Sequence, residues 1–325
     1  MKATKVLFTY LIFAVTALIG FATSALGQEY PSKPVRILVG YPPGAAPDVV
    51  ARTVGDALSQ TFGQPFVVEN KPGASGTIAT GMAAKSPADG YTLLSGDTGQ
   101  LEIAPHLIKA LPYDTLRDLT PVGMVCKTNL IFATNSKSQI RTIKDLIRVA
   151  KANPGKLNYG SSGVGSIHQI IFEAFNAAAG TKMTHIPFKS AALTLSAMLN
   201  GDVDVMMGTT SLVPHMRSGA INLLGVSSDE RYPLAPQVPF ISEDLRGFDF
   251  AWEGGILAPA GLPPDVLAKL SKAMKAATET PKMQQPYKNL GLILVWTTPE
   301  AYKDKIRQNL RKFERVIRAA NIQSN

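Results

Sequence analysis

The hydrophobic residues follow two alternating spacings along the chain, which predict strands separated by helices. Val35–Val39 is an aliphatic run typical of a buried strand, and helical spacing returns from Val50 to Phe62. The intervening segment, Gly40–Pro47, contains prolines and glycines that cannot continue a strand. A helix therefore begins at the carboxyl end of a strand, where its unpaired N–H groups favour an anion. The alternative is an ordinary strand–helix connection.

The same alternation continues to residue 95, with strands at 64–69 and 91–95 and a helix at 78–85. Strands that alternate with helices are typical of a parallel sheet covered on both faces. The turn 96–99 follows the third strand. Because carboxyl ends of parallel strands share one edge, Thr98 is expected beside the first loop.

A second unit repeats this architecture after an extended crossing at 121–134. Its strands are predicted at 156–160, 183–188 and 203–207. The loop Ser161–Ser166 precedes a helix with one apolar face, from Ile167 to Ala178. The apolar stretch 252–258 leads back to the first unit. We therefore predict domain I at residues 28–127 and 250–325, domain II at residues 128–249, and hinges near 126–130 and 248–256.

The first 27 residues are typical of a secretory signal peptide. Lys2 and Lys5 precede the apolar run Val6–Phe21, and small residues up to Gly27 fit a cleavage site. This segment predicts a periplasmic, exported protein. Loss of the two lysines lowers the formal net charge from +9 to +7.

Composition excludes several functions. Hydrophobic content of 45% and charged content of 18% indicate a soluble globular chain. The chain lacks the dense basic runs with interleaved aromatic residues that are typical of nucleic-acid binding, so we expect no nucleic-acid partner. Cys126 cannot form an intramolecular disulfide, and apolar neighbours favour a core position for it. The four histidines lack metal-ligand spacing, so we expect no metal site and no cofactor.

The two small-residue loops form the candidate site. If they face one another across a cleft, both can direct backbone N–H groups at one small organic carboxylate. Several residues keep a second interpretation: Asp48 as a helix cap, Tyr41 as a core aromatic, His168 and Lys189 as solvated residues, and Asp204 as the partner of a structural hydroxyl. The candidate ligand-binding residues are Tyr41, Pro43, Gly44, Ala45, Ala46, Asp48, Thr98, Ser161, Ser162, Gly165, Ser166, His168, Lys189, Asp204, Thr209 and Thr210.

Sequence motifs give little support to catalysis. The loop 161–166 contains no G-x-S-x-G elbow and no phosphate-loop ending. An exported hydrolase is retained as a second hypothesis.

Several short motifs together resemble one family of receptors. They are YPSKPVR at 30–36, YPPG at 41–44, VENKPG at 68–73, ADGYTL at 88–93, KANPGKLNYGSSG at 151–163, MTHIPF at 183–188 and GDVDV at 201–205. In this order they resemble the tripartite tricarboxylate transporter substrate-binding receptors, the Bug-type extracytoplasmic solute receptors. The resemblance covers nearly the whole mature chain.

This resemblance implies an α/β fold of the two-domain type II periplasmic binding protein class, with mostly parallel sheets and a hinged cleft that closes like a Venus flytrap. It implies a non-enzymatic, monomeric receptor that captures a carboxylate without a cofactor and delivers it to a membrane permease. The alternative is a sensor that signals to a membrane kinase. In the family, the loops at 41–48 and 161–166 hold a carboxylate, and residues near 97–98 and after Asp204 help set specificity.

Two departures from the family pattern concern the ligand. Gly44-Ala45 stands where family members usually have two glycines, and Ala46-Pro47 stands where Pro-Thr is common. Met206–Ser211 replaces a stretch that often carries an aromatic, Asp and Asn. The far end of the pocket is therefore expected to accept a less charged or more apolar substrate tail, and aliphatic dicarboxylates, amino acids and aromatic acids all fit.

Overall fold

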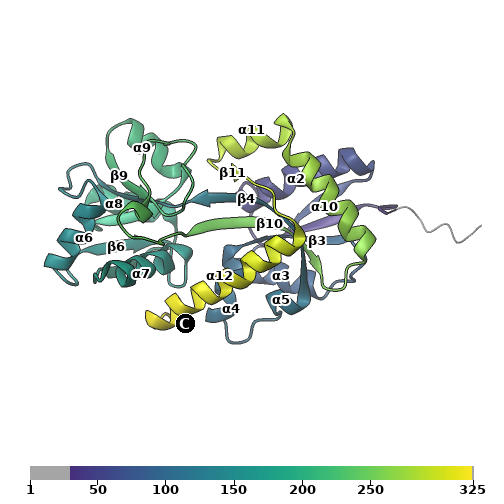
Figure 1. The fold of residues 1–325 in the computed structure, drawn as a ribbon, viewed down its shortest axis with the longest axis horizontal. Coiled ribbons are helices and arrows are strands. Elements are labelled where there is room, and N and C mark those ends of the chain that lie inside the picture. The colour runs from purple at the N-terminus through teal and green to yellow at the C-terminus, as the bar shows by residue number, and fades with distance from the viewer. Residues whose placement is uncertain (1–29, 324–325) are drawn as a thin grey trace, which may run out of the picture.

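The computed structural model describes residues 30–323 and consists of two α/β lobes joined by long strands (Figure 1). The predicted signal peptide lies outside the described residues. From its start to the crossing, the chain forms β1 (Val35–Val39), α2 (Ala46–Phe62), β2 (Phe66–Asn70), η2 (Ala74–Gly76), α3 (Thr77–Ala84), β3 (Thr92–Asp97), the π-helical turn η3 (Gly99–Ile103), α4 (Ala104–Leu107), α5 (Thr115–Asp118) and β4 (Leu119–Asn129).

The second lobe follows directly. It contains β5 (Ile131–Asn135), α6 (Ile143–Ala152), β6 (Asn158–Ser161), α7 (Ile167–Ala179), β7 (Thr184–Pro187), α8 (Ala191–Asn200), β8 (Val205–Gly208), η4 (Thr210–Leu212), α9 (Val213–Arg217), β9 (Ile221–Val226) and η5 (Ile241–Glu243). The chain then returns through β10 (Ala251–Pro259), α10 (Pro264–Thr278), α11 (Pro281–Asn289), β11 (Ile293–Leu294) and α12 (Pro299–Ala319).

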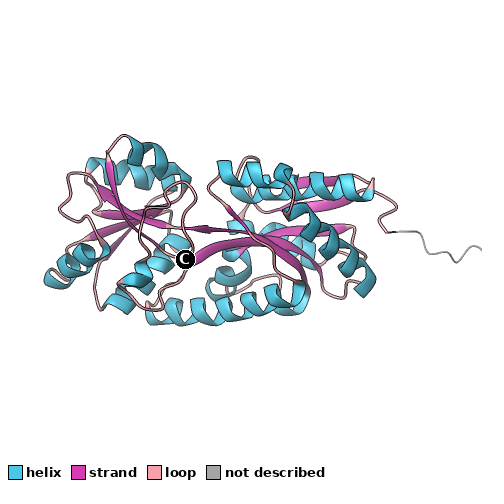
Figure 2. Ribbon diagram, turned by 45° about the horizontal axis from the view of Figure 1, so that its top comes forward, coloured by secondary structure: helices cyan, strands magenta, loops and turns pink. Residues whose placement is uncertain are grey.

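Each lobe has its own sheet (Figure 2), with strand orders β11-β4-β10-β3-β1-β2 and β7-β6-β8-β5-β9. The expectation of mostly parallel sheets holds only for strands connected through helices: β1 pairs in parallel with β2 and β3, and β6 with β7 and β8. The crossing and return strands β4, β5, β9, β10 and β11 pair antiparallel, so both sheets are mixed. The chain leaves the first lobe through β4 and returns through β10, so these two neighbouring strands run in opposite directions.

Several helix ends carry the residue types that favour capping. The Oγ1 of Thr142 and the Oγ of Ser190 accept hydrogen bonds from backbone N–H groups at the starts of α6 and α8. Gly180 ends α7 in the left-handed conformation that glycine adopts without strain, at φ +61°. The two sheets separate close to the predicted boundaries, since β4 ends at Asn129 and β5 begins at Ile131. The domain boundaries themselves stay a prediction.

Helix α12 extends along both lobes (Figure 1). Its Tyr302 and Ile306 belong to a core with β3 and β4, whereas Phe313 and Ile317 pack into the core of the second lobe. The two lobes therefore share a helix as well as two strands. Among residues 30–323, no helix is both long and apolar enough to cross a membrane.

Candidate functional site

The loop between β1 and α2 is built around Asp48, which is buried. Its Oδ2 accepts hydrogen bonds from the Gly44 N–H at 2.9 Å and the Arg52 Nε at 3.0 Å, and its Oδ1 accepts one from the Asn70 Nδ2 at 2.8 Å. Burial raises the pKa of Asp48, but these hydrogen bonds outweigh it and leave the pKa below its usual value. Both carboxylate oxygens are occupied, so Asp48 shapes the loop.

The loop between β6 and α7 brings small residues close to the other lobe. Gly163 and Gly165 have φ of +128° and +77°, which favours glycine. A Cβ at Gly165 would lie 2.7 Å from the Cδ1 of Leu107 in α4, so the end of the Leu107 side chain would have to shift. Ser166 caps α7, since its Oγ accepts a hydrogen bond from the Gln169 N–H at 3.4 Å.

Two serines in this loop are paired with histidines. The Oγ of Ser161 lies 2.6 Å from the Nε2 of His185, and the Oγ of Ser162 lies 2.8 Å from the Nδ1 of His168. Burial lowers the pKa of both imidazoles, to about 4 for His168. Both rings are therefore neutral at pH 7 and bring no positive charge to the loop.

A cavity of about 380 Å³ lies between the lobes, within the range of small-molecule sites. The second lobe contributes the end of its loop and the first residue of α7. The first lobe contributes Tyr41, the end of β3, the turns η3 and α4, and Trp252 of β10. The lining residues are Tyr41, Ser75, Asp97, Gly99, Ile103, Ala104, Leu107, Ile108, Ser162, Val164, Gly165, Ser166, Ile167 and Trp252.

Asp97 is the one carboxylate among these lining residues, and only 1% of its surface is exposed. Its Oδ1 accepts hydrogen bonds from the Tyr41 hydroxyl at 3.2 Å, the Gly99 N–H at 2.8 Å and the Gln100 N–H at 3.3 Å. Its Oδ2 is buried without a well-formed hydrogen bond in the described structure, and the neighbouring Trp252 side chain also stabilises the ionised carboxylate. Burial raises the pKa of Asp97 to about 6, although its hydrogen bonds oppose that shift.

The structure brings five of the candidate residues together around this cavity: Tyr41, Ser162, Gly165, Ser166 and, through its hydrogen bond to Ser162, His168. Ser161 is buried behind them. The expectation that the first loop would bring its amides into the cavity is only partly met. Of that loop, only Tyr41 lines the cavity, whereas the turn that carries Pro43, Gly44, Ala45 and Ala46 does not.

Other candidates take structural positions. Thr98 is buried and its Oγ1 accepts a hydrogen bond from the Glu253 N–H at 2.9 Å, which fastens β3 to β10. The Oδ2 of Asp204 accepts one from the Asn158 N–H at 2.7 Å. Asn158 begins β6 and Asp204 precedes the parallel strand β8, so this pair lies at the strand ends opposite the loop. Asp204 therefore lies away from the cavity.

The remaining candidates lie away from the lining. Lys189 is exposed, just before the Ser190 cap of α8. The Oγ1 of Thr210 donates a hydrogen bond to the Leu290 carbonyl at 2.6 Å and so links the lobes outside the cavity. Thr209 precedes it and does not line the cavity.

The candidate list named Thr98, while the family resemblance pointed to residues 97–98 together, and of the two only Asp97 lines the cavity. Ser75, Trp252 and the segment 103–108 also line it and were not named as candidates. Strand alternation could have separated Asp97 from Thr98, since successive side chains point to opposite faces. The segment 103–108 gave no signal, because it lies in short turns whose direction depends on packing.

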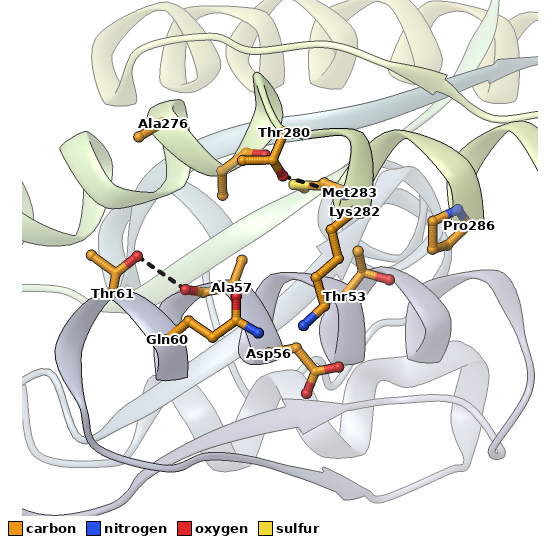
Figure 3. Close-up of a pocket in the computed structure, with 11 residues that line it drawn as sticks. Thr53, Asp56, Ala57, Gln60, Thr61, Ala276, Thr280, Lys282, Met283 and Pro286 are labelled. Carbon is orange, nitrogen blue, oxygen red and sulfur yellow. Dashed lines mark hydrogen bonds between the residues drawn. The ribbon is translucent and has the colours of Figure 1, made fainter.

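A second hollow, also of about 380 Å³, lies within the first lobe between α2 and α11 (Figure 3). It is lined by Thr53, Asp56, Ala57, Gln60, Thr61, Ala276, Ala277, Thr280, Lys282, Met283 and Pro286. None of the candidate residues lines it, and it does not involve the second lobe. Among the described residues, no group of three or more His, Cys, Asp or Glu side chains is placed to hold a metal ion.

Comparisons of the sequence with known proteins all point to the same family. Residues 50–322 match the model of the tripartite tricarboxylate transporter family receptor. Protein BugT of Bordetella pertussis is 31% identical over 321 residues, which cover 98% of both chains. A UPF0065 protein of Bordetella bronchiseptica is 33% identical and covers 92% of this chain and 89% of its own.

Solved structures agree with this. The periplasmic binding protein BugD is 30% identical, with a TM-score of 0.73 over 91% of this chain and 100% of its own. An R. palustris protein solved with adipate is 27% identical, with a TM-score of 0.77 over 91% of this chain and 99% of its own. MatC from Rhodopseudomonas palustris, solved with bound malate, is also 27% identical, with a TM-score of 0.72 over 89% of this chain and 100% of its own. The match over most of the chain, in sequence and in fold, shows that this protein belongs to the tripartite tricarboxylate transporter receptor family.

Proposed function

We propose that this protein is a periplasmic receptor that captures a small organic carboxylate in the cavity between its lobes. The observation that carries the proposal is the position of the α7 N-terminus. Ser162, Gly165, Ser166 and Ile167 line the cavity where this helix begins. The first N–H groups of a helix have no intrahelical partner and carry a partial positive charge, so they attract a carboxylate.

The rest of the cavity supports the same ligand class. Polar groups of Tyr41, Ser75 and Ser162 lie among the apolar side chains of Ile103 and Leu107. Within residues 30–323, no lysine or arginine lines the cavity. A bound carboxylate would thus be neutralised by backbone N–H groups and hydroxyls, which need little rearrangement. The relatives solved with adipate and with malate support a carboxylate for this chain too.

The finer parts of the function follow from the family. We infer that the first 27 residues direct export, that the receptor is a monomer, and that it delivers its ligand to a membrane permease of the tripartite tricarboxylate type. Growth on the identified ligand should then require both this protein and the permease genes. Normal uptake in a receptor deletion strain, with loss of a ligand-induced transcriptional response, would favour the sensor alternative.

A thermal-shift panel of carboxylates tests the receptor function. A ligand at 100 times its Kd stabilises the native state by about 2.7 kcal/mol, which raises the melting temperature measurably. Ser162→Phe places a bulky ring in the cavity and should abolish the shift while the unliganded protein still melts cooperatively. Gln60→Phe is the matched control, since Gln60 is exposed and lines only the second hollow.

If a broad carboxylate panel gives no shift while a sugar or a simple amine does, the proposal is wrong. An unchanged carboxylate affinity in Ser162→Phe would instead contradict the assignment of the cavity.

The Ser162–His168 pair is the one arrangement in the cavity that favours the hydrolase alternative. A hydrolytic pair is oriented by a third group, and among the described residues no carboxylate contacts His168. A receptor uses the same contact to hold the loop. Turnover of a chromogenic ester that disappears in Ser162→Ala would support the hydrolase.

A further inference from the structure

The positive charge of this chain is concentrated in its last helices. Residues 28–259 contain 19 Lys and Arg and 19 Asp and Glu, so their formal charges cancel. Residues 260–325, which include α10, α11 and α12, contain 12 Lys and Arg against 5 Asp and Glu. This segment therefore carries the whole net charge of +7 that remains once the predicted signal peptide is removed. A charge gathered in one segment favours association with an anionic partner there.

Helix α10 presents three of these cations to solvent. Lys269, Lys272 and Lys275 are exposed, while the buried residues of the helix pack into the core of the first lobe. Residues three apart are neighbours on a helix surface, so the three charges act together. Within residues 30–323 none of them forms an ion pair, either with the acids nearest in sequence, Asp265 and Glu279, or with any other carboxylate. Their charges are therefore free to meet a partner.

The start of α12 lies beside α10 (Figure 1), and a hollow of about 560 Å³ lies between them. Lys272 and Lys275 line the hollow from α10, together with the apolar side chain of Leu267. The segment before α12 contributes the half-buried indole of Trp296, and Glu300 is the one acid of the described residues that line it. The hollow thus combines apolar side chains with two cations, which is the combination that binds an anionic amphiphile.

We propose that α10 and this hollow form a docking surface for the anionic phospholipids of a membrane. Lipid headgroups present an extended array of negative charge, which attracts clustered lysines over a Debye length of about 10 Å at 0.1 M salt. Lysine stems and indole rings are also the groups that proteins place at the boundary between headgroups and acyl chains. An acidic protein surface would match the lysines alone, whereas a phospholipid matches the apolar lining as well.

This surface lies apart from the ligand cavity, since the residues that line the hollow and those that line the cavity do not overlap. The inference goes beyond ligand capture and shares with the proposed function only the expectation that the receptor works against a membrane. Docking through α10 would raise the local concentration of the receptor beside the permease without using the residues that hold the ligand.

Sedimentation with lipid vesicles tests the proposal, using the mature chain so that the predicted signal peptide is absent. Vesicles of phosphatidylcholine alone are compared with vesicles in which half of the lipid is phosphatidylglycerol. The wild-type protein should bind the anionic vesicles and should not bind the neutral ones. Binding should be lost when the salt is raised from about 0.1 M to about 1 M, because the Debye length falls from about 10 Å to about 3 Å.

A triple variant with Lys269→Gln, Lys272→Gln and Lys275→Gln removes the cations of α10 and keeps a good helix former at each position. It should bind the anionic vesicles about 10-fold or more weakly than the wild type, because each lysine near an anionic surface adds to the attraction. Circular dichroism checks that the variant is folded.

The matched control is a second triple variant with Lys151→Gln, Lys156→Gln and Lys182→Gln. It removes the same charge from exposed lysines of the second lobe. It should bind the anionic vesicles nearly as tightly as the wild type, because these lysines lie outside the docking surface.

Three outcomes would overturn the proposal. The first is wild-type protein that does not bind anionic vesicles at about 0.1 M salt. The second is an equal loss in both triple variants, because binding would then follow the net charge and not α10. The third is binding only to vesicles that carry the permease, whatever their lipid charge, which would identify an acidic protein surface as the partner. The α10 variant should keep the ligand-dependent thermal shift, so a missing shift in every protein would count against the receptor function and not against this surface.

Discussion

Replacement of Asp97 by asparagine should change how the stability of the unliganded protein depends on pH. Burial raises the pKa of Asp97 from 3.8 to about 6. The native state therefore holds the proton of Asp97 more tightly than the unfolded chain does, so wild-type stability increases as the pH falls through 6 towards 4. Above pH 7 the ionised carboxylate lowers the free energy of unfolding by about 3 kcal/mol, at about 1.4 kcal/mol per pKa unit.

The asparagine variant lacks this titration. Its side chain keeps the shape and one acceptor oxygen of Asp97, and any cost of its buried amide hydrogens is the same at every pH. The difference in unfolding free energy between variant and wild type should therefore shift in favour of the variant by about 2 kcal/mol between pH 4.5 and pH 8. This shift is specific to one titrating carboxyl.

Titration of the neighbouring groups should not produce the same pH dependence of the stability difference. Raised pKa values keep the side chains of Tyr41, Tyr113, Tyr302 and Cys126 neutral throughout this pH range. Burial and the proximity of Glu253 also raise the pKa of Glu102, but that contribution is common to both proteins and cancels in the difference.

Urea unfolding followed by circular dichroism at half-unit pH steps measures this difference, with Asp56→Asn as an exposed control that should show little change. A difference that is flat between pH 4.5 and pH 8 would refute the reasoning, since it would mean that Asp97 titrates normally in the folded state. A shift of the expected sign would show that this receptor keeps a buried carboxylate at the expense of stability, as functional sites often do.

Two further changes test the support of the site. Asp48→Asn weakens the hydrogen bonds that hold the first loop and should lower the unfolding free energy by about 1–3 kcal/mol at pH 7. The loss should become smaller at acid pH, because the pKa of Asp48 lies below its usual value. Asp56→Asn is again the control, and equal stability of the two variants would contradict a structural role for Asp48. Phe313→Ala removes a buried ring of α12 from the second-lobe core and should lower the free energy of unfolding in urea by about 3–5 kcal/mol. The control Arg311→Ala changes an exposed residue of the same helix and should lower it little. A small loss of stability in Phe313→Ala would mean that α12 does not join the lobes.

Local patterns in the sequence predicted most of the framework. The prolines and glycines after β1 and the serine cap of α7 mark where strands become helices, and these signals act within a few residues. Helix α11 was missed, because Pro286 and many polar residues interrupt its apolar pattern. The antiparallel strands were expected only as extended crossings, because strand direction depends on partners that lie far away in the chain.

The residues of the candidate site were harder to predict from the sequence than the framework, because their positions depend on packing. Asp48 and Thr98 were reasonable candidates at loop ends, yet contacts with Asn70 and Glu253 use their polar atoms for structure. The sequence alone determined an α/β chain with two small-residue loops at strand ends, because composition and spacing are local properties. Only the tertiary structure decided that the buried Asp97 and the α7 N-terminus line one cavity between the lobes, because desolvation and the direction of a side chain arise from residues that the fold brings together.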